Sequence, residues 1–594
     1  MPDYQPPLRD MMFLYNEVLH GQYLQTLPGF EEVDAETVEA ILEEAGKFCV
    51  QELLPINRSG DESGCQWDEG RVTTPEGFKQ AYQVFIESGW GALAMDPKYG
   101  GQGLPKTLHL MVDEMMCASN MAFSLYPGLT NGAYAALMSY ASDEIKQRFV
   151  PKMAEGSWAA TMCLTEPHCG TDLGLLRTRA IAQEDGSYHL TGSKMFITAG
   201  EHDLSENILH LVLAKTPDAP AGVKGISLFI VPKINIDDAG NLGEANGVSC
   251  GSIEHKMGIK ASATCVMNFD NAKGYLVGEL NKGMRAMFKM MNIERVAVGV
   301  QGIGIGEAAY QGAVAYAKER LQGRALSGAK HPDQPADPLT VHPDIRRMLL
   351  TIRANTEGSR ALAVWLGMLL DKSAREPDPG SQQQAEDLVA LLTPIAKAYM
   401  TDLGFESAVL GQQVFGGHGY IRENRMEQLV RDARIAQIYE GTNGVQAMDL
   451  VGRKLMAENG RYFNTYLEIV AGFITENETN EALAEFIHPL NTAFTHLQEC
   501  SSWLAKAAGS NVEEVGAAAY DYLRLMGLVT LALLWTQMAQ TALSASEQSD
   551  DPFYKTKLKT ARFFMQRLLP QTASLKIAIQ SGADLMMGFE DEEF

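Results

Sequence analysis

The spacing of apolar residues divides the chain into helical stretches on either side of a middle part that is rich in strand signals. In the first part, segments such as 35–54 and 108–119 carry apolar residues at helical spacing. From about 159 to 283, short runs rich in β-branched residues, such as 208–214 and 225–231, are separated by Gly, Asn and Asp. This middle part is predicted to be a small β-domain.

The helical period then returns and continues to the C-terminus. Long helical segments are predicted at 284–320, 342–372 and 385–410. The stretches 324–343 and 376–380 are rich in Gly, Pro and Asp, and we expect loops there. The pattern therefore predicts a mostly α-helical protein with a central β-domain. Its four expected parts are an N-terminal helical domain (1–158), a middle β-domain (159–283), a C-terminal helical bundle (284–456) and an additional helical domain (461–594).

One glycine-rich stretch, 299–306, could be mistaken for a dinucleotide-binding loop. After Gly302 and Gly304, the third glycine of G-x-G-x-x-G would fall on the position of Glu307. The flanking residues continue a single helical pattern, so no strand precedes the glycines. We therefore expect these small residues to allow close packing of helices.

Charge and cysteine content exclude some classes of function. A net charge of −25 over 594 residues argues against a nucleic-acid partner, because phosphate binding needs clustered Lys and Arg. The eight cysteines include no CxxC pair and no zinc-finger spacing, which favours reduced thiols and no metal site.

The sequence also bears on the location of the protein in the cell. The first residues lack the basic end and apolar run of a signal peptide. The longest apolar stretch, Leu525–Trp535, is interrupted by Thr530 and is too short to span a bilayer. We expect a cytoplasmic protein without an integral membrane segment.

Two neighbouring segments of the β-domain concentrate polar chemistry. The segment 164–172, Leu-Thr-Glu-Pro-His-Cys-Gly-Thr-Asp, is predicted to be a loop that offers backbone N–H groups and two hydroxyls, although an ordinary β-turn would explain it as well. In the segment 192–200, Phe196 and Thr198 are two positions apart on a predicted strand and therefore share a face. Such a pair could cover a flat ring and form a hydrogen bond with its edge.

These segments resemble those of the acyl-CoA dehydrogenase family, whose β-domain carries an LTEPxxGSD loop and a G-x-K-x-(W/F)-I-T strand. The resemblance continues downstream and keeps the family's order over about residues 35–456. The matching segments are Asn292-Ile293-Glu294-Arg295, Tyr316-Ala317-Lys318-Glu319-Arg320, residues 413–420, residues 431–435 and Ile438-Tyr439-Glu440-Gly441-Thr442-Asn443. The length and the block beyond 461 resemble a bacterial branch of about 600 residues that includes fatty acyl-CoA and 3-methylmercaptopropionyl-CoA dehydrogenases.

The resemblance implies the family's fold and the roles of individual residues. It implies contacts with FAD for Thr165, Thr171, Phe196, Thr198, Arg320, Gln322, Gln413, Gly416, Gly417 and Thr442. It implies contacts with acyl-CoA for Thr171, Asn292, Arg295 and Gly441. Some family members share FAD contacts between subunits, so we expect a homo-oligomer, with a dimer as the smallest form.

The sequence departs from the family pattern at three places. His168-Cys169 replaces the commoner Gly/Asn-Ala, and Thr171 replaces serine, changes that a loop led by its backbone tolerates. The segment Leu321-Gln322-Gly323-Arg324 replaces the usual Phe-Gly pattern and leaves the adenine-side contacts open.

The resemblance also implies the reaction, which is α,β-dehydrogenation of a medium- or long-chain fatty acyl-CoA with electrons passed to an electron-transferring flavoprotein. Glu440 is expected to remove the α-proton, because a carboxylate that is desolvated beside its substrate gains basicity. Alternatives are 3-methylmercaptopropionyl-CoA as substrate, an acyl-CoA oxidase that uses dioxygen, and a non-catalytic nucleic-acid-binding relative, which the charge opposes.

A second carboxylate, Glu294, occupies the position from which some family members supply their base. It is either a helix glutamate paired with a nearby cation or a second carboxylate near the substrate.

The last block, residues 461–594, contains one recognisable apolar pattern. An apolar stripe of Tyr554, Leu558, Ala561, Met565 and Leu568 is flanked by basic residues. We expect it to pack onto the protein body and not onto a membrane surface.

Overall fold

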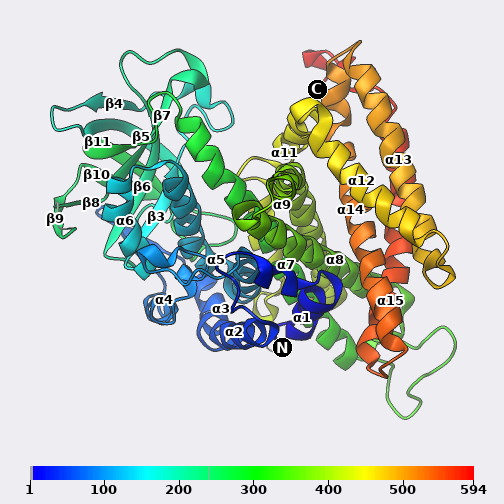
Figure 1. Cartoon of the computed structure of the whole chain (residues 1–594). Coiled ribbons are helices and arrows are strands. Elements are labelled where there is room, and N and C mark those ends of the chain that lie inside the picture. The colour runs from blue at the N-terminus through cyan, green and yellow to red at the C-terminus, as the bar shows by residue number, and fades with distance from the viewer. Residues whose placement is uncertain (1–3, 238–239) are drawn as a thin grey trace. The chain divides into compact units, whose positions relative to one another are not determined.

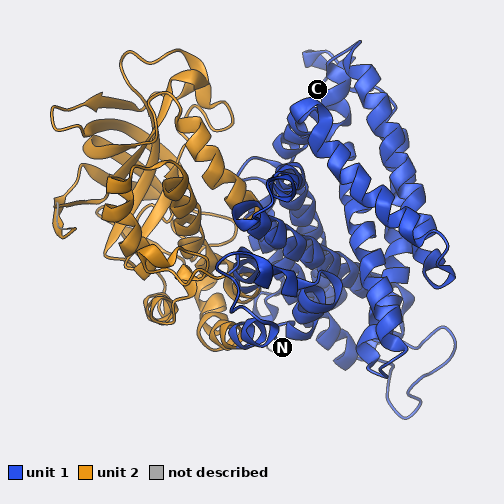
Figure 2. Cartoon of the chain, in the orientation of Figure 1, with its two compact units in different colours: residues 1–43, 105–114, 298–594 blue, residues 44–104, 115–297 orange. Residues whose placement is uncertain are grey.

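The computed structural model describes residues 4–237 and 240–594 (Figure 1). Residues 1–3, with which the predicted N-terminal domain begins, lie outside the described part. Contacts along the chain define two compact units (Figure 2). Unit 1 contains Met1–Glu43, Pro105–Glu114 and Val298–Phe594, and unit 2 contains Glu44–Leu104 and Met115–Ala297. The division into four domains stays a prediction, since the bundle and the last block fall into one of these units.

The middle of unit 2 is a seven-stranded sheet, as the β-branched runs predicted. Its main order is β10-β11-β5-β4-β6-β3, and β7 pairs with both β11 and β6. Only the β3–β6 and β4–β6 pairs are parallel. The strands are β3 (Trp158–Cys163), β4 (Arg179–Ala182), β5 (Tyr188–Thr198), β6 (Asn207–Lys215), β7 (Ile226–Pro232), β10 (Val248–Ile253) and β11 (Thr264–Val277). Strands β6 and β7 are buried almost throughout, which explains their unbroken apolar runs.

Two small hairpins complete the strands of unit 2. The strands β8 (Ile234–Ile236) and β9 (Leu242–Ala245) pair beside the sheet. The strands β1 (Gln66–Asp68) and β2 (Arg71–Thr73) form a hairpin inside the stretch that the sequence pattern predicted to be helical. Each strand has only three residues, too few for a period of two to be recognised.

Helices precede and follow the sheet along the chain, and they make up most of unit 1. Those before the sheet are α2 (Ala35–Phe48), α3 (Leu54–Ser63), α4 (Phe78–Glu87), α5 (Lys106–Tyr140) and α6 (Asp143–Glu155). Unit 1 begins with α1 (Leu8–Met12) and contains the second part of α7 (Gly283–Glu319), α8 (Pro343–Arg375), α9 (Pro379–Phe415), α10 (Met426–Arg434) and α11 (Asn443–Asp449). The last block consists of α12 (Arg461–Asn477), α13 (Ala484–Ala508), α14 (Glu513–Ser546), α15 (Pro552–Phe563), α16 (Gln571–Ile579) and α17 (Asp584–Met587).

The glycine-rich stretch 299–306 lies inside α7, and its expected role in close packing is confirmed. A Cβ atom on Gly302 would lie 2.4 Å from the carbonyl oxygen of Met400 on α9. A Cβ atom on Gly299 would lie 2.6 Å from the carbonyl oxygen of Ala396. Any larger side chain would therefore push α7 away from α9.

The start of α9 differs by two residues from the predicted loop. The expected loop 376–380 ends at Asp378, whose carboxylate accepts a hydrogen bond from the backbone N–H of Ser381 (2.8 Å). Pro379 occupies the first helical position, where its fixed φ suits a helix. The cap and the proline start the helix earlier than the composition suggested.

The apolar stripe of the last block is buried as expected, with one shift. Tyr554, Leu558, Ala561 and Met565 are buried, and Tyr554 donates a hydrogen bond to Glu17 (2.7 Å). A π-helical turn at Phe564–Leu568 then advances the stripe, so that Leu569 is buried in place of Leu568.

Two helices in the described part of the chain are long and apolar enough to cross a membrane by length and composition alone. They are Pro379–Tyr420 and Glu513–Ser546, and 78% of the most apolar window of each is buried inside the protein. A core helix passes the same test, so this is weak evidence for a membrane span.

Candidate active site

The loop after β3 is a tight turn that is held in place by the carboxylate of Glu166. Glu166 and Cys169 exchange backbone hydrogen bonds of 2.9 and 3.0 Å, with Pro167 and His168 between them. The buried carboxylate of Glu166 accepts hydrogen bonds from the backbone N–H of Arg177 (2.7 Å) and from the N–H (3.0 Å) and hydroxyl (2.6 Å) of Thr178. The carboxylate thus ties the turn to the start of β4.

Lys194 of β5 completes this arrangement. Its side chain is fully buried, and its ammonium group donates to Oε1 of Glu166 (2.9 Å) and to the carbonyl of Leu164 (3.0 Å). Burial alone would raise the pKa of Glu166, but the ammonium of Lys194 and the hydrogen bonds from Thr178 outweigh it and hold this pKa below its usual value. The carboxyl is therefore ionised, and the ion pair joins the loop to the strand that follows it.

The predicted aromatic and hydroxyl lie together at the end of β5. The backbone N–H of Met195 donates to the carbonyl of Thr165 (3.0 Å), which brings the loop and the strand side by side. A bulge in the β5–β11 pairing falls here, and Phe196 has a positive φ of 59°. Phe196 is 57% exposed and Thr198 is partly exposed, whereas Ile197 between them is buried. The strand thus presents a bare aromatic ring next to a hydroxyl.

Three threonine hydroxyls of this loop and strand form no hydrogen bond with the described part of the chain. Within residues 4–237 and 240–594, the hydroxyls of Thr165, Thr171 and Thr198 form no hydrogen bond. The exposed ring of Phe196 and these hydroxyls are therefore accessible to a ligand.

The predicted acyl-CoA contacts Asn292 and Arg295, together with Glu294, lie on the first part of α7, in unit 2. Arg295 donates to the side-chain oxygen of Asn292 (3.3 Å). Glu294 is buried, and a Cβ atom on Gly132 of α5 would lie 2.2 Å from its Oε1. The carboxylate of Glu294 therefore lies directly against α5 at position 132, and a larger residue there would require the Glu294 side chain to move.

Glu440, in unit 1, lies on a strained turn before α11. Its φ of 54° is left-handed, as is the φ of 82° at Gly441. The backbone carbonyls of both residues accept hydrogen bonds from the buried Gln446 side chain (3.2 and 3.4 Å). The Tyr439 hydroxyl donates to Gln301 of α7, and the Thr442 hydroxyl caps α11 by accepting from Val445 (3.3 Å). The turn is therefore held at several points.

A further set of predicted residues lies where α7 and α9 end, in unit 1. The Tyr316 ring on α7 stacks on Phe415 of α9 with ring centres 4.1 Å apart, and its hydroxyl bonds with His418 (2.8 Å). The exposed predicted residues at these two helix ends are Arg320, Gln322, Gln413, Gly416 and Gly417. The stacking brings the two helix ends together, and Gly416 has a φ of 59° that turns the chain sharply.

The altered segment after Arg320 has a structural function of its own. The buried carboxylate of Asp337 accepts hydrogen bonds from the backbone N–H groups of Ala325, Lys330 and His331 (3.0, 3.1 and 2.7 Å). Arg324 donates to Asp337 and to two carbonyl groups of the same loop. Burial would raise the pKa of Asp337, but the three N–H groups outweigh it and lower this pKa. Arg324 thus serves to fold the loop.

One group of metal-ligand types occurs in the described residues. Ligand atoms of Glu166, His168 and Cys169 lie within 4.8 Å of one another. Both oxygens of Glu166 already accept the hydrogen bonds described above, one of them from an ammonium group. The arrangement is that of a folded loop.

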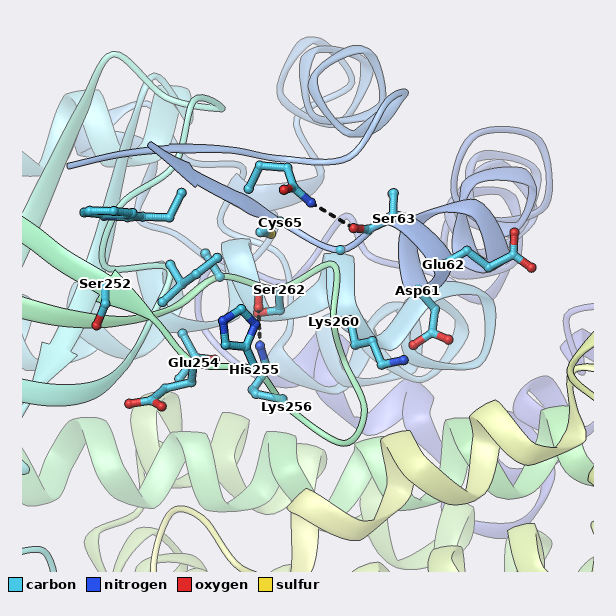
Figure 3. A pocket seen from close by; sticks show the side chains of 16 residues that line it. Asp61, Glu62, Ser63, Cys65, Ser252, Glu254, His255, Lys256, Lys260 and Ser262 are labelled. Atoms are coloured by element: carbon cyan, nitrogen blue, oxygen red, sulfur yellow. Dashed lines mark hydrogen bonds between the residues drawn. The ribbon is translucent and has the colours of Figure 1, made fainter. Parts of the chain in front are cut away.

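A hollow elsewhere in unit 2 contains none of the predicted site residues. It lies between the β1–β2 hairpin and the β10–β11 connection and has a volume of about 460 Å³ (Figure 3). Lys256 donates to the carbonyl of Ser262 (2.7 Å), and the thiol of Cys65 donates to Ala261 (3.2 Å). Its charged side chains include both signs.

The residues that support these sites carry little signal in the sequence. Lys194 stood inside a quoted motif, and its charge at an otherwise buried position was the available signal. Gln301 and Asp402 are single polar residues on the long helices α7 and α9, and Gln446 is a single polar residue on the short helix α11. Their partners lie far away in sequence, so no spacing identified them.

Four family profiles match the chain in order. Three describe the acyl-CoA dehydrogenase N-terminal domain (residues 35–157), middle domain (161–272) and C-terminal domain (281–456). The fourth, described as acetyl-CoA dehydrogenase C-terminal like, matches residues 466–590.

Similar proteins match over nearly the full length. The chain is 41% identical to 3-methylmercaptopropionyl-CoA dehydrogenase of Ruegeria pomeroyi, covering 98% of this chain and 99% of the relative. It is 32% identical to the broad-specificity linear acyl-CoA dehydrogenase FadE5 of Mycobacterium tuberculosis, covering 100% of both. An acyl-CoA dehydrogenase of Bacillus anthracis solved in complex with FAD shares the fold, with a TM-score of 0.75, 22% identity and coverage of 95% of this chain and 92% of that one.

Proposed function

Because the chain belongs to the acyl-CoA dehydrogenase family, whose members are FAD-dependent oxidoreductases acting on CH–CH bonds, we propose that it converts a medium- or long-chain fatty acyl-CoA to the trans-2-enoyl-CoA in the cytoplasm. The observation that supports this most is the turn of Glu440. A glutamate held at a left-handed φ of 54° between backbone and side-chain hydrogen bonds is a strained position of the kind found at functional sites.

Glu440 acts as the base that removes the α-proton of the thioester. A carboxylate in water is too weak a base for this proton, so the site has to raise its basicity by excluding water. It also has to stabilise the negative charge that develops on the thioester oxygen, and a backbone N–H group does so best when it is fixed in advance. The hydrogen bonds from Gln446 fix the backbone of Glu440 and Gly441 for this purpose.

The residues of the β-domain fit FAD. Phe196 offers an exposed ring for the flavin, and the unpaired hydroxyls of Thr165, Thr171 and Thr198 offer partners for its polar edge and for the pyrophosphate. FAD, when bound, accepts the hydride equivalent that leaves the β-carbon. The other residues that we assign to FAD are Arg320, Gln322, Gln413, Gly416, Gly417 and Thr442. Sharing of some of them between subunits would make the protein at least a dimer.

Acyl-CoA is proposed to contact Thr171, Asn292, Arg295 and Gly441. Glu294 is assigned a structural role, because its carboxylate is packed at Gly132. The electrons would pass from the flavin to an electron-transferring flavoprotein.

One observation favours a second substrate. The relative with 41% identity over nearly the full length is named for 3-methylmercaptopropionyl-CoA, a short thioether thioester. The second candidate function is therefore dehydrogenation of that substrate by the same residues.

A substrate panel tests both proposals. The FAD-loaded protein is mixed without oxygen with acyl-CoAs of increasing chain length and with 3-methylmercaptopropionyl-CoA, and loss of flavin absorbance is followed. Fastest bleaching by a chain of medium or greater length supports the first proposal, and fastest bleaching by the thioether supports the second. Absence of bleaching by every thioester would contradict both. Re-oxidation by air as fast as by the flavoprotein acceptor would instead indicate an oxidase.

A further inference from the structure

The last helical block reaches the turn of Glu440 through one tyrosine. Helix α14 packs on α9 and α11 in unit 1. Near its start, the Tyr520 hydroxyl donates a hydrogen bond to Oδ2 of Asp402 on α9 (2.5 Å). This bond joins residues 118 positions apart in the chain.

The other oxygen of the same carboxylate holds both ends of the turn. Oδ1 of Asp402 accepts hydrogen bonds from the side chains of Gln437 (2.7 Å) and Asn443 (2.8 Å). Gln437 precedes Glu440 by three residues, and Asn443 follows it by three. Asp402 therefore clamps the two ends of the segment 438–442.

The clamp is connected to the core at its Asn443 end. Asn443 is buried, its oxygen accepts from Lys397 (2.8 Å), and its amide also donates to the carbonyl of Ala398 (3.1 Å). A strained φ such as that of Glu440 persists only where the surroundings fix it. The clamp supplies part of that restraint.

The position of Tyr520 is set by the packing of its own helix. Seven residues further along α14, a Cβ atom on Gly527 would lie 2.4 Å from the ring of Tyr399. Tyr399 lies three residues before Asp402 on α9, so both lie on one helical face. The close contact between Gly527 and Tyr399 therefore fixes how α14 lies along α9, and this places Tyr520 opposite Asp402.

Resting on the proposed function of Glu440, we propose that Tyr520 is a positioning residue of the catalytic turn, and that one role of the last helical block is to supply it. The hydroxyl holds Asp402 in the orientation that clamps Gln437 and Asn443. Burial and the bond to Asp402 raise the pKa of Tyr520, so the phenol keeps its proton and remains a donor at neutral pH. Its ring is 39% exposed, so removal of the hydroxyl leaves the core intact.

The test is Tyr520→Phe, with Tyr522→Phe as the matched control. Tyr522 lies two residues further along the same helix, is buried, and its hydroxyl bonds with Ser501 (2.7 Å) inside the last block. Flavin reduction is measured without oxygen at saturating acyl-CoA and over a range of pH, together with FAD content and melting temperature.

Tyr520→Phe is expected to slow flavin reduction at saturating acyl-CoA roughly tenfold, as for loss of a hydrogen bond to a charged group. Any loss of FAD or acyl-CoA affinity through Thr442 and Gly441, which lie in the same segment, is expected to be smaller than this. The acidic limb of the pH–rate profile of Tyr520→Phe is expected at lower pH, because a less restrained turn lets water reach Glu440 and water lowers the pKa of that carboxyl. Tyr522→Phe is expected to lower the melting temperature and leave both the rate and the pH profile as in the wild type. Asp402→Asn combined with Tyr520→Phe should be no slower than Asp402→Asn alone.

A wild-type rate and pH profile in Tyr520→Phe would overturn the inference, and so would an equal change in Tyr522→Phe. Glu440→Gln in the same assay separates this failure from failure of the proposed function. If Glu440→Gln is inactive and Tyr520→Phe behaves as the wild type, only the inference falls. If Glu440→Gln retains its rate, the assignment of the base falls and the inference with it.

Discussion

Replacement of Lys194 by Met is predicted to destabilise the β-domain and to loosen FAD. Methionine keeps the length of the side chain and removes the charge, so the change removes the ion pair with Glu166 together with the hydrogen bond to the carbonyl of Leu164. Both partners are buried, with the Lys194 side chain 0% and that of Glu166 3% exposed. Removing one member of a buried pair typically costs about 3–5 kcal/mol. Since Arg177 and Thr178 still donate to the carboxylate, we expect the lower end, about 3 kcal/mol.

The assay is thermal unfolding together with FAD retention, and the chain offers a matched control. A loss of about 3 kcal/mol corresponds to a fall in melting temperature of roughly 6–12 °C for a unit of this size. Lys273→Met breaks an ion pair with Asp185 in the same domain, but those side chains are 36% and 55% exposed. This control should change the melting temperature by no more than about 3 °C and should retain FAD. Equal effects of the two replacements would refute the reasoning that the buried pair holds the loop.

Two further predictions concern carboxylates. Glu114 lies in a buried cluster around Arg360, where burial, first of all, and the neighbouring carboxylates of Glu307 and Asp10 raise its pKa from 4.5 to about 7. The contribution of Glu114 to stability is therefore present below about pH 4.5 and is lost as the pH rises through 7. Glu114→Gln should flatten the dependence of the melting temperature on pH over this range. An unchanged slope of melting temperature against pH would contradict this. Glu294→Gln should leave the pH dependence of flavin reduction unchanged, because its carboxylate is assigned to packing at Gly132. A shift of the acidic limb to lower pH, or residual activity of Glu440→Gly that disappears on adding Glu294→Gln, would place Glu294 beside the substrate.

The sequence predicted the fold well wherever a period extended over many residues. The long helices α7 and α8 and the buried strands β6 and β7 lie close to their expected bounds, whereas α9 extends several residues beyond both ends of the expected segment 385–410. The hairpin of β1 and β2 was missed because three residues cannot display a period. The stripe on α15 shifted by one residue because a π-helical turn adds a residue that no apolar pattern reveals.

In the candidate site, as in the fold, contiguous sequence patterns were predictable and isolated residues were not. Contiguous motifs placed Phe196, Thr198 and Glu440 on the predicted strand and turn, and close packing at Gly302 followed from small residues on a helix. The residues that hold these groups in place could not be predicted. Asp402 and Tyr520 are 118 positions apart, and only the folded chain brings such single polar side chains together. The roles assigned to the site residues stay predictions until they are measured.

The most direct measurement of the central claim is flavin reduction by acyl-CoA in Glu440→Gln. Glutamine preserves the shape of the side chain and removes the base, so FAD and acyl-CoA binding should be retained while bleaching of the flavin is abolished. Retention of more than about a tenth of the wild-type rate would be too much for the loss of a positioned general base and would contradict the assignment of Glu440.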